Sequence, residues 1–315
     1  MSAPEKKEEV SKDLFKHVLF GVGVTAAAYP LTYAKVLVQI GHEPIAPKLT
    51  TTWLGRKTLV LPNVFKYVGH IWNEDGFFGI YRGLTFKLAT AAVASATAHS
   101  VLENLQQQQK KKKSVYEDIG SSDNPSVKAF VIETSNHVIS QTAAIIVSQP
   151  LHVMTIRSMA QFVGGEQHYS GFFSSFVDIW REEGILGFFS GMMPRLFGEL
   201  LIILVANSVT FVVNSWVFTE MDVRHYCAPI ANILAGTVMY PFNVVSTVMA
   251  VNSSGLVAGS PPAMPHYTGW IDCWKQLSRE HALKRGSSMM VRYYTGPVIQ
   301  RDNSSVPVKK GNPVT

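Results

Sequence analysis

The sequence predicts an all-α membrane protein in which a repeated unit builds a bundle of about five membrane-spanning helices. Three observations support this prediction. Apolar residues make up 47% of the chain and charged residues only 16%, whereas a water-soluble domain carries about 25% charged residues. Long apolar segments alternate with shorter polar ones. The chain also repeats a sequence unit, and the last copy is shortened.

The apolar segments are each long enough to cross a bilayer, which takes about 20 mostly apolar residues. Pro30, Pro150 and Pro241 lie inside the first, third and fifth segments. A proline there removes an internal hydrogen bond and kinks the helix, and membrane bundles tolerate such kinks. The segments are Leu14–Ile40, Gly83–Leu105, Val127–Val163, Gly191–Phe218 and Tyr226–Leu256.

The repeat is visible in two gapless alignments. HYSGFFSSFVDIWREEG at 168–184 aligns with HYTGWIDCWKQLSREHA at 266–282, and HIWNEDGFFGIYRGL at 70–84 aligns with DIWREEGILGFFSGM at 178–192. Such a period indicates a repeat architecture. The unit is a kinked helix, a surface helix, an acidic–Gly turn and a second membrane helix. After His281 no apolar stretch is long enough to span, so we expect the sixth helix to be missing.

These features divide the chain into six parts. A polar N-terminal segment precedes two complete repeats, which a Gln/Lys-rich linker joins, and a truncated third repeat leads into a polar tail. Without its sixth helix, the bundle is expected to expose a polar groove to lipid. The ranges are 1–13, 14–105 (repeat 1), 106–126 (linker), 127–218 (repeat 2), 223–286 (truncated repeat 3) and 287–315 (tail).

Charge and cysteine content add little to this picture. The net charge is +6, and Lys110–Lys113 form one run, which is typical of a solvated loop, with anionic lipid headgroups as an alternative contact. The two cysteines match no disulfide or metal pattern. The first 13 residues contain acids as well as bases, whereas transit peptides are poor in acids, so we expect no cleaved presequence.

The repeat resembles the mitochondrial carrier superfamily, whose unit joins Pro-x-Asp/Glu-x-x-Lys/Arg on an odd helix to an acidic–Gly and an aromatic–basic–Gly element. Residues 75–83 fit the second element closely, and residues 183–191 fit it except for the basic residue. The carrier-signature positions of this chain are Pro30, Lys35, Pro150, Pro241, Asp75, Gly76, Tyr81, Arg82, Gly83, Glu183 and Gly184.

The first element of the carrier unit is degenerate in every repeat. In repeat 1, Thr32 stands at the acid position, and Lys35 keeps the base. In a carrier, these acid–base pairs close one side of the central cavity and open it when they break, so a sealed alternating pore is hard to build here. Repeats 2 and 3 carry His152, Thr155, Asn243 and Ser246 at these positions.

These departures resemble the mitochondrial carrier homologs, a divergent outer-membrane branch of the superfamily. Similar stretches are YAKVLVQ at 33–39, REEGILGFF at 181–189, MAVN at 249–252 and WIDCW at 270–274. The resemblance implies a multi-pass protein of the mitochondrial outer membrane that inserts α-helical proteins, including tail-anchored ones. It also implies lipid scrambling and docking of an apoptotic regulator. The alternatives are a receptor or scaffold without translocation activity and an inner-membrane solute carrier.

Polar residues recur at helical spacing within the apolar segments and predict the lining of the groove. An ionised side chain at bilayer depth costs at least about 2.5–3.5 kcal/mol, so such residues face the bundle interior or water. For the neutral members, packing between helices is an equal alternative, and Arg195 and Glu199 have the i, i+4 spacing of a self-neutralising pair. The candidate residues for client passage are Lys35, Glu133, His137, Gln141, Arg195, Glu199, Asn207 and Asn243.

The sequence contains no Ser/His/Asp set, Gly-rich phosphate loop or metal-ligand cluster. We therefore expect the chain not to be an enzyme, with no catalytic residue, cofactor or metal. The expected partners are membrane-protein clients, membrane lipids and the apoptotic regulator implied by the resemblance, and no nucleic acid.

Overall fold

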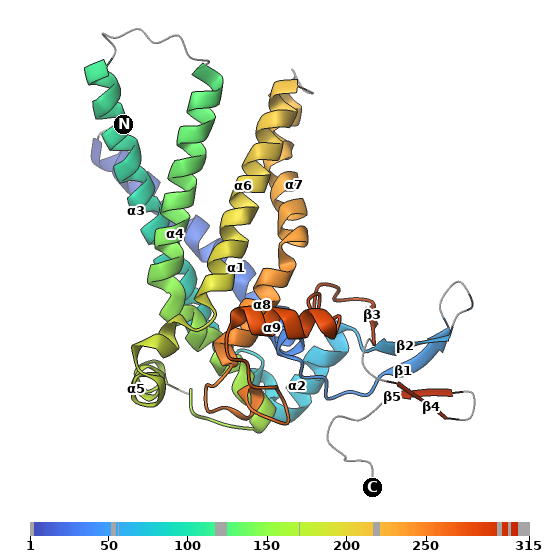
Figure 1. Cartoon of the computed structure of the whole chain (residues 1–315). Helices are drawn as coiled ribbons and strands as arrows, with labels where there is room; N and C mark the ends of the chain where they lie inside the picture. The colour runs from blue at the N-terminus through green and yellow to red at the C-terminus, as the bar shows by residue number, and fades with distance from the viewer. Residues whose placement is uncertain are drawn as a thin grey trace.

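The computed structural model describes residues 3–51, 55, 57–116, 125–169, 171–216, 221–294, 298–301 and 304–307. Long helices stand on a base of short helices and loops (Figure 1). The long helices are α1 (Ala3–Ile40), α3 (Leu84–Tyr116), α4 (Pro125–Ala160), α6 (Met192–Trp216) and α7 (Met221–Val238). The base contains α2 (Val64–Gly79), α5 (Phe172–Glu183), α8 (Tyr240–Val251) and α9 (Trp270–Arg279), with the short 3-10 helices η1 (Gln161–Gly164), η2 (Ile185–Phe189) and η3 (Val257–Gly259).

The predicted helical repeat bundle is confirmed, whereas the number of membrane spans stays a prediction. Within the described residues, one helical stretch, Ile185–Val213, is long and apolar enough to cross a membrane. Cys227–Val238 and Tyr240–Val251 qualify together, but they are bent by 57° at the break between them. α1, α3 and α4 are longer than a span, and polar side chains dilute their apolar character.

Two small sheets correct the expectation of an all-α chain. β1 (Lys48–Thr51), β2 (Lys57–Leu61) and β3 (Arg292–Tyr293) form an antiparallel sheet in the order β1-β2-β3. β4 (Val298–Arg301) pairs with β5 (Ser304–Pro307). The first sheet joins the loop after α1 to the chain after α9. Because this pairing is between segments far apart in sequence, local periodicity could not reveal it.

Three boundaries also differ from expectation. The Lys110–Lys113 run was expected in a loop, but α3 continues through it to Tyr116, because Gln and Lys are good helix formers. α1 begins at Ala3, so most of the polar N-terminal segment is helical. The fifth apolar segment is divided into α7 and α8, since Pro241 lies in the first turn of α8 and cannot continue the hydrogen bonding of α7.

The hydrophobic core lies at the base, where the C-terminal halves of α1 and α4 meet α8. Tyr33, Met154 and Val248 are completely buried there. Near the other end of α1, Leu19 and Phe20 are 59% and 73% exposed, as expected for a helix that faces lipid. Around the bundle, α3 packs on α4, α4 on α6, and α6 on α7, while α1 packs on α3, α4 and α8. α1 and the α7–α8 pair therefore flank the sector where the repeat would place a sixth helix.

Candidate functional site

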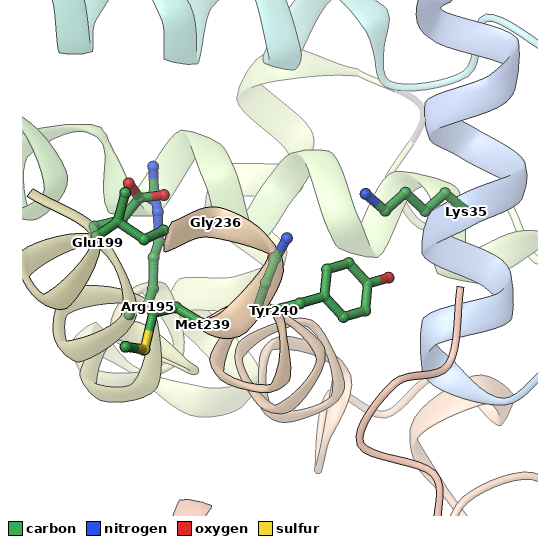
Figure 2. A pocket seen from close by; sticks show the side chains of 9 residues that line it. Lys35, Arg195, Glu199, Gly236, Met239 and Tyr240 are labelled. Atoms are coloured by element: carbon green, nitrogen blue, oxygen red, sulfur yellow. The ribbon is translucent and has the colours of Figure 1, made fainter. Parts of the chain in front are cut away.

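A cavity of about 240 Å³ lies between α1, α6, α7 and α8, within that sector. Figure 2 shows Lys35 entering from α1, Arg195 and Glu199 from α6, and Tyr240 from the start of α8. We call this cavity the furrow. The other residues that line it are Gly198, Ile202, Gly236, Met239 and Asn243.

The charged side chains of the furrow make few contacts with other side chains of the protein. Arg195 Nη1 donates to Gln149 Oε1 at 2.7 Å, and Lys35 Nζ lies 5.0 Å from the centre of the Tyr240 ring, within the range of a cation–π contact. Among the ion pairs of the described residues, none includes Lys35 or Glu199. The spacing of Arg195 and Glu199 suggested a pair, yet Arg195 turns to Gln149 instead. A charged ligand can therefore contact Lys35 and Glu199 directly.

Further basic groups surround Arg195. Lys87 on α3 and His152 on α4 both lie within electrostatic reach of its guanidinium, and Glu199 on the next helical turn acts on it with the opposite sign. Lys87 lies one turn after Gly83, as Arg195 does after Gly191. Comparison of equivalent repeat positions would therefore have found Lys87, which the helical stripes missed.

Half of the predicted groove residues line the furrow, namely Lys35, Arg195, Glu199 and Asn243. The other half do not. Glu133 and His137 are exposed, and Gln141 is half-buried, all on the part of α4 that precedes Pro150. Asn207 Nδ2 on α6 donates to Thr134 Oγ1 on α4 at 3.4 Å. Asn207 thus takes the packing role that was its alternative.

At the base, the residue before each proline forms an equivalent hydrogen bond. Its side chain donates to a carbonyl in the turn that follows the surface helix of the same repeat. The donors Tyr29, Gln149 and Tyr240 meet the carbonyl oxygens of Arg82, Ser190 and Arg285 at 2.6, 3.0 and 2.8 Å. We call each of these contacts a pre-proline clamp. The hydropathy and helical spacing of the sequence did not predict these three donors, although their shared place before proline was a usable signal.

Each clamp carbonyl is followed by a glycine that packs on the next repeat. Gly83, Gly191 and Gly286 have φ values of +84°, +70° and +73°. A Cβ on Gly191 would overlap the carbonyl oxygen of Ser246 on α8, and one on Gly286 would lie 3.4 Å from the carbonyl oxygen of Lys35 on α1. The truncated third repeat therefore still packs on the first repeat, which closes the base without a sixth helix among the residues that the structure describes.

Neutral side chains complete the junction between α1 and α8. Gln39 Nε2 donates to Tyr240 Oη at 2.8 Å, and Thr247 Oγ1 donates to Gln39 Oε1 at 3.2 Å. Gln39 is 2% exposed and Thr247 is 3% exposed. Neutral, buried hydrogen bonds thus hold α1 to α8 at this junction.

Two ion pairs of the base lie at the acidic–Gly elements, and a third joins Arg292 on β3 to Glu43 after α1. Arg157, which is completely buried, contacts Glu183 with both terminal nitrogens, with Nη2 2.8 Å from Oε2, and its Nε donates to the Ala250 carbonyl at 2.9 Å. Arg82 Nη2 lies 3.0 Å from Asp75 Oδ2, an ion contact without hydrogen-bond geometry. Arg157 was not predicted, because the carrier unit has its base at the fifth position after proline, and Arg157 is the seventh after Pro150.

Burial also shifts the pKa values of two side chains that lie outside the long helices. Burial raises the pKa of the completely buried Cys273 thiol to about 12. Burial, with a smaller effect of the neighbouring His70, lowers the pKa of His42 to about 4. His42 follows α1, and its carbonyl accepts from Tyr67 Oη at 2.8 Å. The His42 imidazole is therefore neutral at neutral pH.

A sequence model of the family described as "Mitochondrial carrier protein" matches residues 6–113 and 130–219, which include most of the two complete repeats. The chain belongs to the mitochondrial carrier family. It is 38% identical to "Mitochondrial carrier homolog 2" of Homo sapiens, over 89% of this chain and 94% of that protein. It is 37% identical to "Mitochondrial carrier homolog 1" of Mus musculus, over 87% of this chain and 75% of that protein.

Typical members of the mitochondrial carrier family are more distant. The chain is 21% identical to "Mitochondrial 2-oxoglutarate/malate carrier protein" of Homo sapiens, over 84% of this chain and 82% of that protein. The resemblance to mitochondrial carrier homologs is therefore confirmed. This carrier homolog is a mitochondrial membrane protein, from a family that generally consists of transporters rather than enzymes.

Proposed function

We propose that this carrier homolog inserts α-helical proteins, including tail-anchored ones, into the mitochondrial outer membrane. The proposal rests on the furrow, which lies in the sector of the missing sixth helix. Lys35 and Glu199 line it without an ion pair among the described residues. Charged groups that line an open cavity and have no ion-pair partner there suit a transient polar ligand better than a permanent structural role.

The physical task of an insertase is to lower the cost of moving a polar chain end through hydrocarbon. Each unsatisfied backbone polar group costs several kcal/mol there. A furrow with charged and amide side chains can satisfy part of the client's end while the apolar helix of the client remains in contact with lipid. Since the described part of the chain places no sixth helix in this sector, the client would leave sideways without opening a ring.

The closed base argues against the rival function of an alternating solute carrier. Alternation requires contacts at the base to break and re-form in each cycle. Here the base is held by the three pre-proline clamps and by Gln39 between α1 and α8. We infer that the base stays closed, so the furrow shortens the hydrocarbon path from one side only.

The test uses purified protein in liposomes with a radiolabelled tail-anchored client and, separately, labelled metabolites. Insertion per folded molecule is compared for the wild type, Lys35→Glu and Glu199→Arg. At an effective dielectric constant near 20, reversing a charge close to a client charge changes their interaction by more than 1 kcal/mol, so we expect a change of about fivefold or more in rate. Lys48→Glu and Glu74→Arg are matched controls, because both residues are exposed outside the furrow.

The outcomes separate the candidate functions. Client insertion without metabolite uptake supports the insertase. Client binding without insertion would indicate a receptor or scaffold, and metabolite exchange alone would indicate a solute carrier. If both furrow variants insert normally per folded molecule, Lys35 and Glu199 have no part in the mechanism.

The outer-membrane location has its own test. Protease added to mitochondria with an intact outer membrane should cut at least one loop of an outer-membrane protein. Protection of every loop until the inner membrane is ruptured would contradict the proposal. Lipid scrambling and docking of an apoptotic regulator remain predictions from the family resemblance, and the same liposomes can test the first with labelled lipid.

A further inference from the structure

The three surface helices of the base differ in what they expose. α2, α5 and α9 occupy equivalent places in repeats 1, 2 and 3, so their residues can be compared position by position. In repeat 1, Trp72 and Phe78 are 48% and 86% exposed, and at the matching positions of repeat 2 Trp180 and Leu186 are 54% and 77% exposed. Large apolar side chains therefore point outward from two of the three repeats.

Repeat 3 is polar at both of these outward positions, although Leu283, which is half-buried, matches Phe77 and Ile185. Ser278 matches Trp72 and Trp180, and Lys284, two residues past the aligned stretch, matches Phe78 and Leu186. Both are exposed, as is Lys275 on the same face of α9. Repeat 3 keeps one exposed apolar residue on this helix, Ile271. Its surface helix is thus far less suited to a hydrocarbon environment.

The occupant of the apolar surface follows from its continuity with a membrane span. Among the described residues, Ile185–Val213 meets the requirements for a span by length and composition, and Ile185 and Leu186 are its first residues. Both lie in η2, which a turn at Ser190 and Gly191 joins to α6. Met193 and Phe197 in the next turns are each 47% exposed. Exposed apolar side chains of repeat 2 therefore lie on both sides of the turn at Ser190 and Gly191, on α6 and on η2. We expect lipid that covers the start of α6 to reach Leu186 as well.

We infer that repeats 1 and 2 anchor the base in the adjacent bilayer leaflet, whereas repeat 3 leaves its sector of the base to water and lipid headgroups. Aromatic and aliphatic side chains sit at the boundary of headgroups and acyl chains, and lysine ammonium groups prefer the headgroup phosphates. We call Phe77–Phe78 and Ile185–Leu186 the base wedges.

The unanchored sector coincides with the sector that lacks its second membrane helix. This part of the inference rests on the proposed function. Among the described residues, repeat 3 has neither a second spanning helix nor a base wedge to contact the lipid tails beside it. Headgroups and water can therefore approach the furrow from the base side. The remaining hydrocarbon path of a client would then be shortest where the furrow is open.

The test places an environment-sensitive nitrobenzoxadiazole label at three matched positions, through Phe78→Cys, Leu186→Cys and Lys284→Cys. The full-length background is Cys227→Ser, in which Cys273 remains but is completely buried. In phosphatidylcholine liposomes, the label is quenched either by doxyl groups on the acyl chains or by iodide in the water. Because the readout requires no client, it is independent of whether the insertase proposal succeeds.

We expect the ratio of lipid to aqueous quenching at positions 78 and 186 to exceed that at position 284 by roughly threefold or more. A label on Phe65→Cys, which is exposed on α2, should follow the first two, and one on Ser278→Cys should follow the third. Equal ratios in all three repeats, or aqueous quenching at 78 and 186, would overturn the inference. The unfolding midpoint of each labelled variant verifies that the bundle is intact.

Discussion

Replacing Glu183 by Gln tests how much the buried ion pair contributes to the base. The Arg157 side chain is completely buried, and the Glu183 side chain is only 17% exposed, so water screens this pair weakly. In the variant, Arg157 would keep its hydrogen bond to the Ala250 carbonyl at 2.9 Å, but its charge would lose the carboxylate.

The magnitude follows from leaving a buried guanidinium without a counter-ion. Breaking a buried pair by removing one partner costs about 3–5 kcal/mol. Glutamine keeps the shape of Glu183 and one acceptor oxygen, so we expect the lower end of this range. Replacing both partners, as in Arg157→Met with Glu183→Gln, removes the charge itself, and its total cost should be smaller than the sum of the two single changes.

The assay is unfolding of the purified protein in mild micelles by a denaturing detergent, followed by tryptophan fluorescence for the four members of the cycle. The reasoning would be refuted by a cost of less than about 1 kcal/mol for Glu183→Gln, which is the usual size for an exposed pair. Strict additivity in the cycle would also refute it, because it would mean that the two side chains do not interact.

Three further predictions concern the base. Cys273, with a pKa of about 12, should resist maleimide at neutral pH in a Cys227→Ala background and should react fully after denaturation; reaction of the folded protein would contradict its burial. His42 has a pKa lowered to about 4 in the fold, so protons bind the unfolded state first, and stability should fall as the pH drops from about 6.5 to 4. His42→Gln should flatten that slope in the unfolding midpoint. Gly191→Ala should destabilise the bundle by about 1–3 kcal/mol, since it adds a Cβ at positive φ against α8, whereas Gly23→Ala, with open space around it, should not.

The sequence predicted the helical framework because long apolar segments and a repeat are local or periodic signals. It did not predict the division of the fifth segment at Met239, since hydropathy alone does not distinguish a kink from a break of 57°. It also missed β3, whose two residues gain their structure only by pairing with β2. In both cases, the geometry depends on packing between segments that are far apart in the sequence.

Of the residues predicted for the candidate site, some line the furrow and others do not. Helical spacing correctly grouped Arg195 and Glu199 on one face of α6, and both line the furrow. The same reasoning selected Glu133 and His137 on α4, which are exposed and do not line it. Periodicity identifies a shared face, but it does not tell which part of that face meets a cavity.

The contact of Gly286 with α1 has a consequence for the order of biosynthesis. α1 ends at Ile40, yet the glycine that packs on its Lys35 carbonyl comes nearly 250 residues later. A ribosome releases the N-terminal helix long before its last neighbour exists. The first helix therefore has to wait, in the membrane or with a chaperone, until almost the whole chain has been made. Shortening the chain before Gly286 would remove a contact from the beginning of the protein as well as from its end.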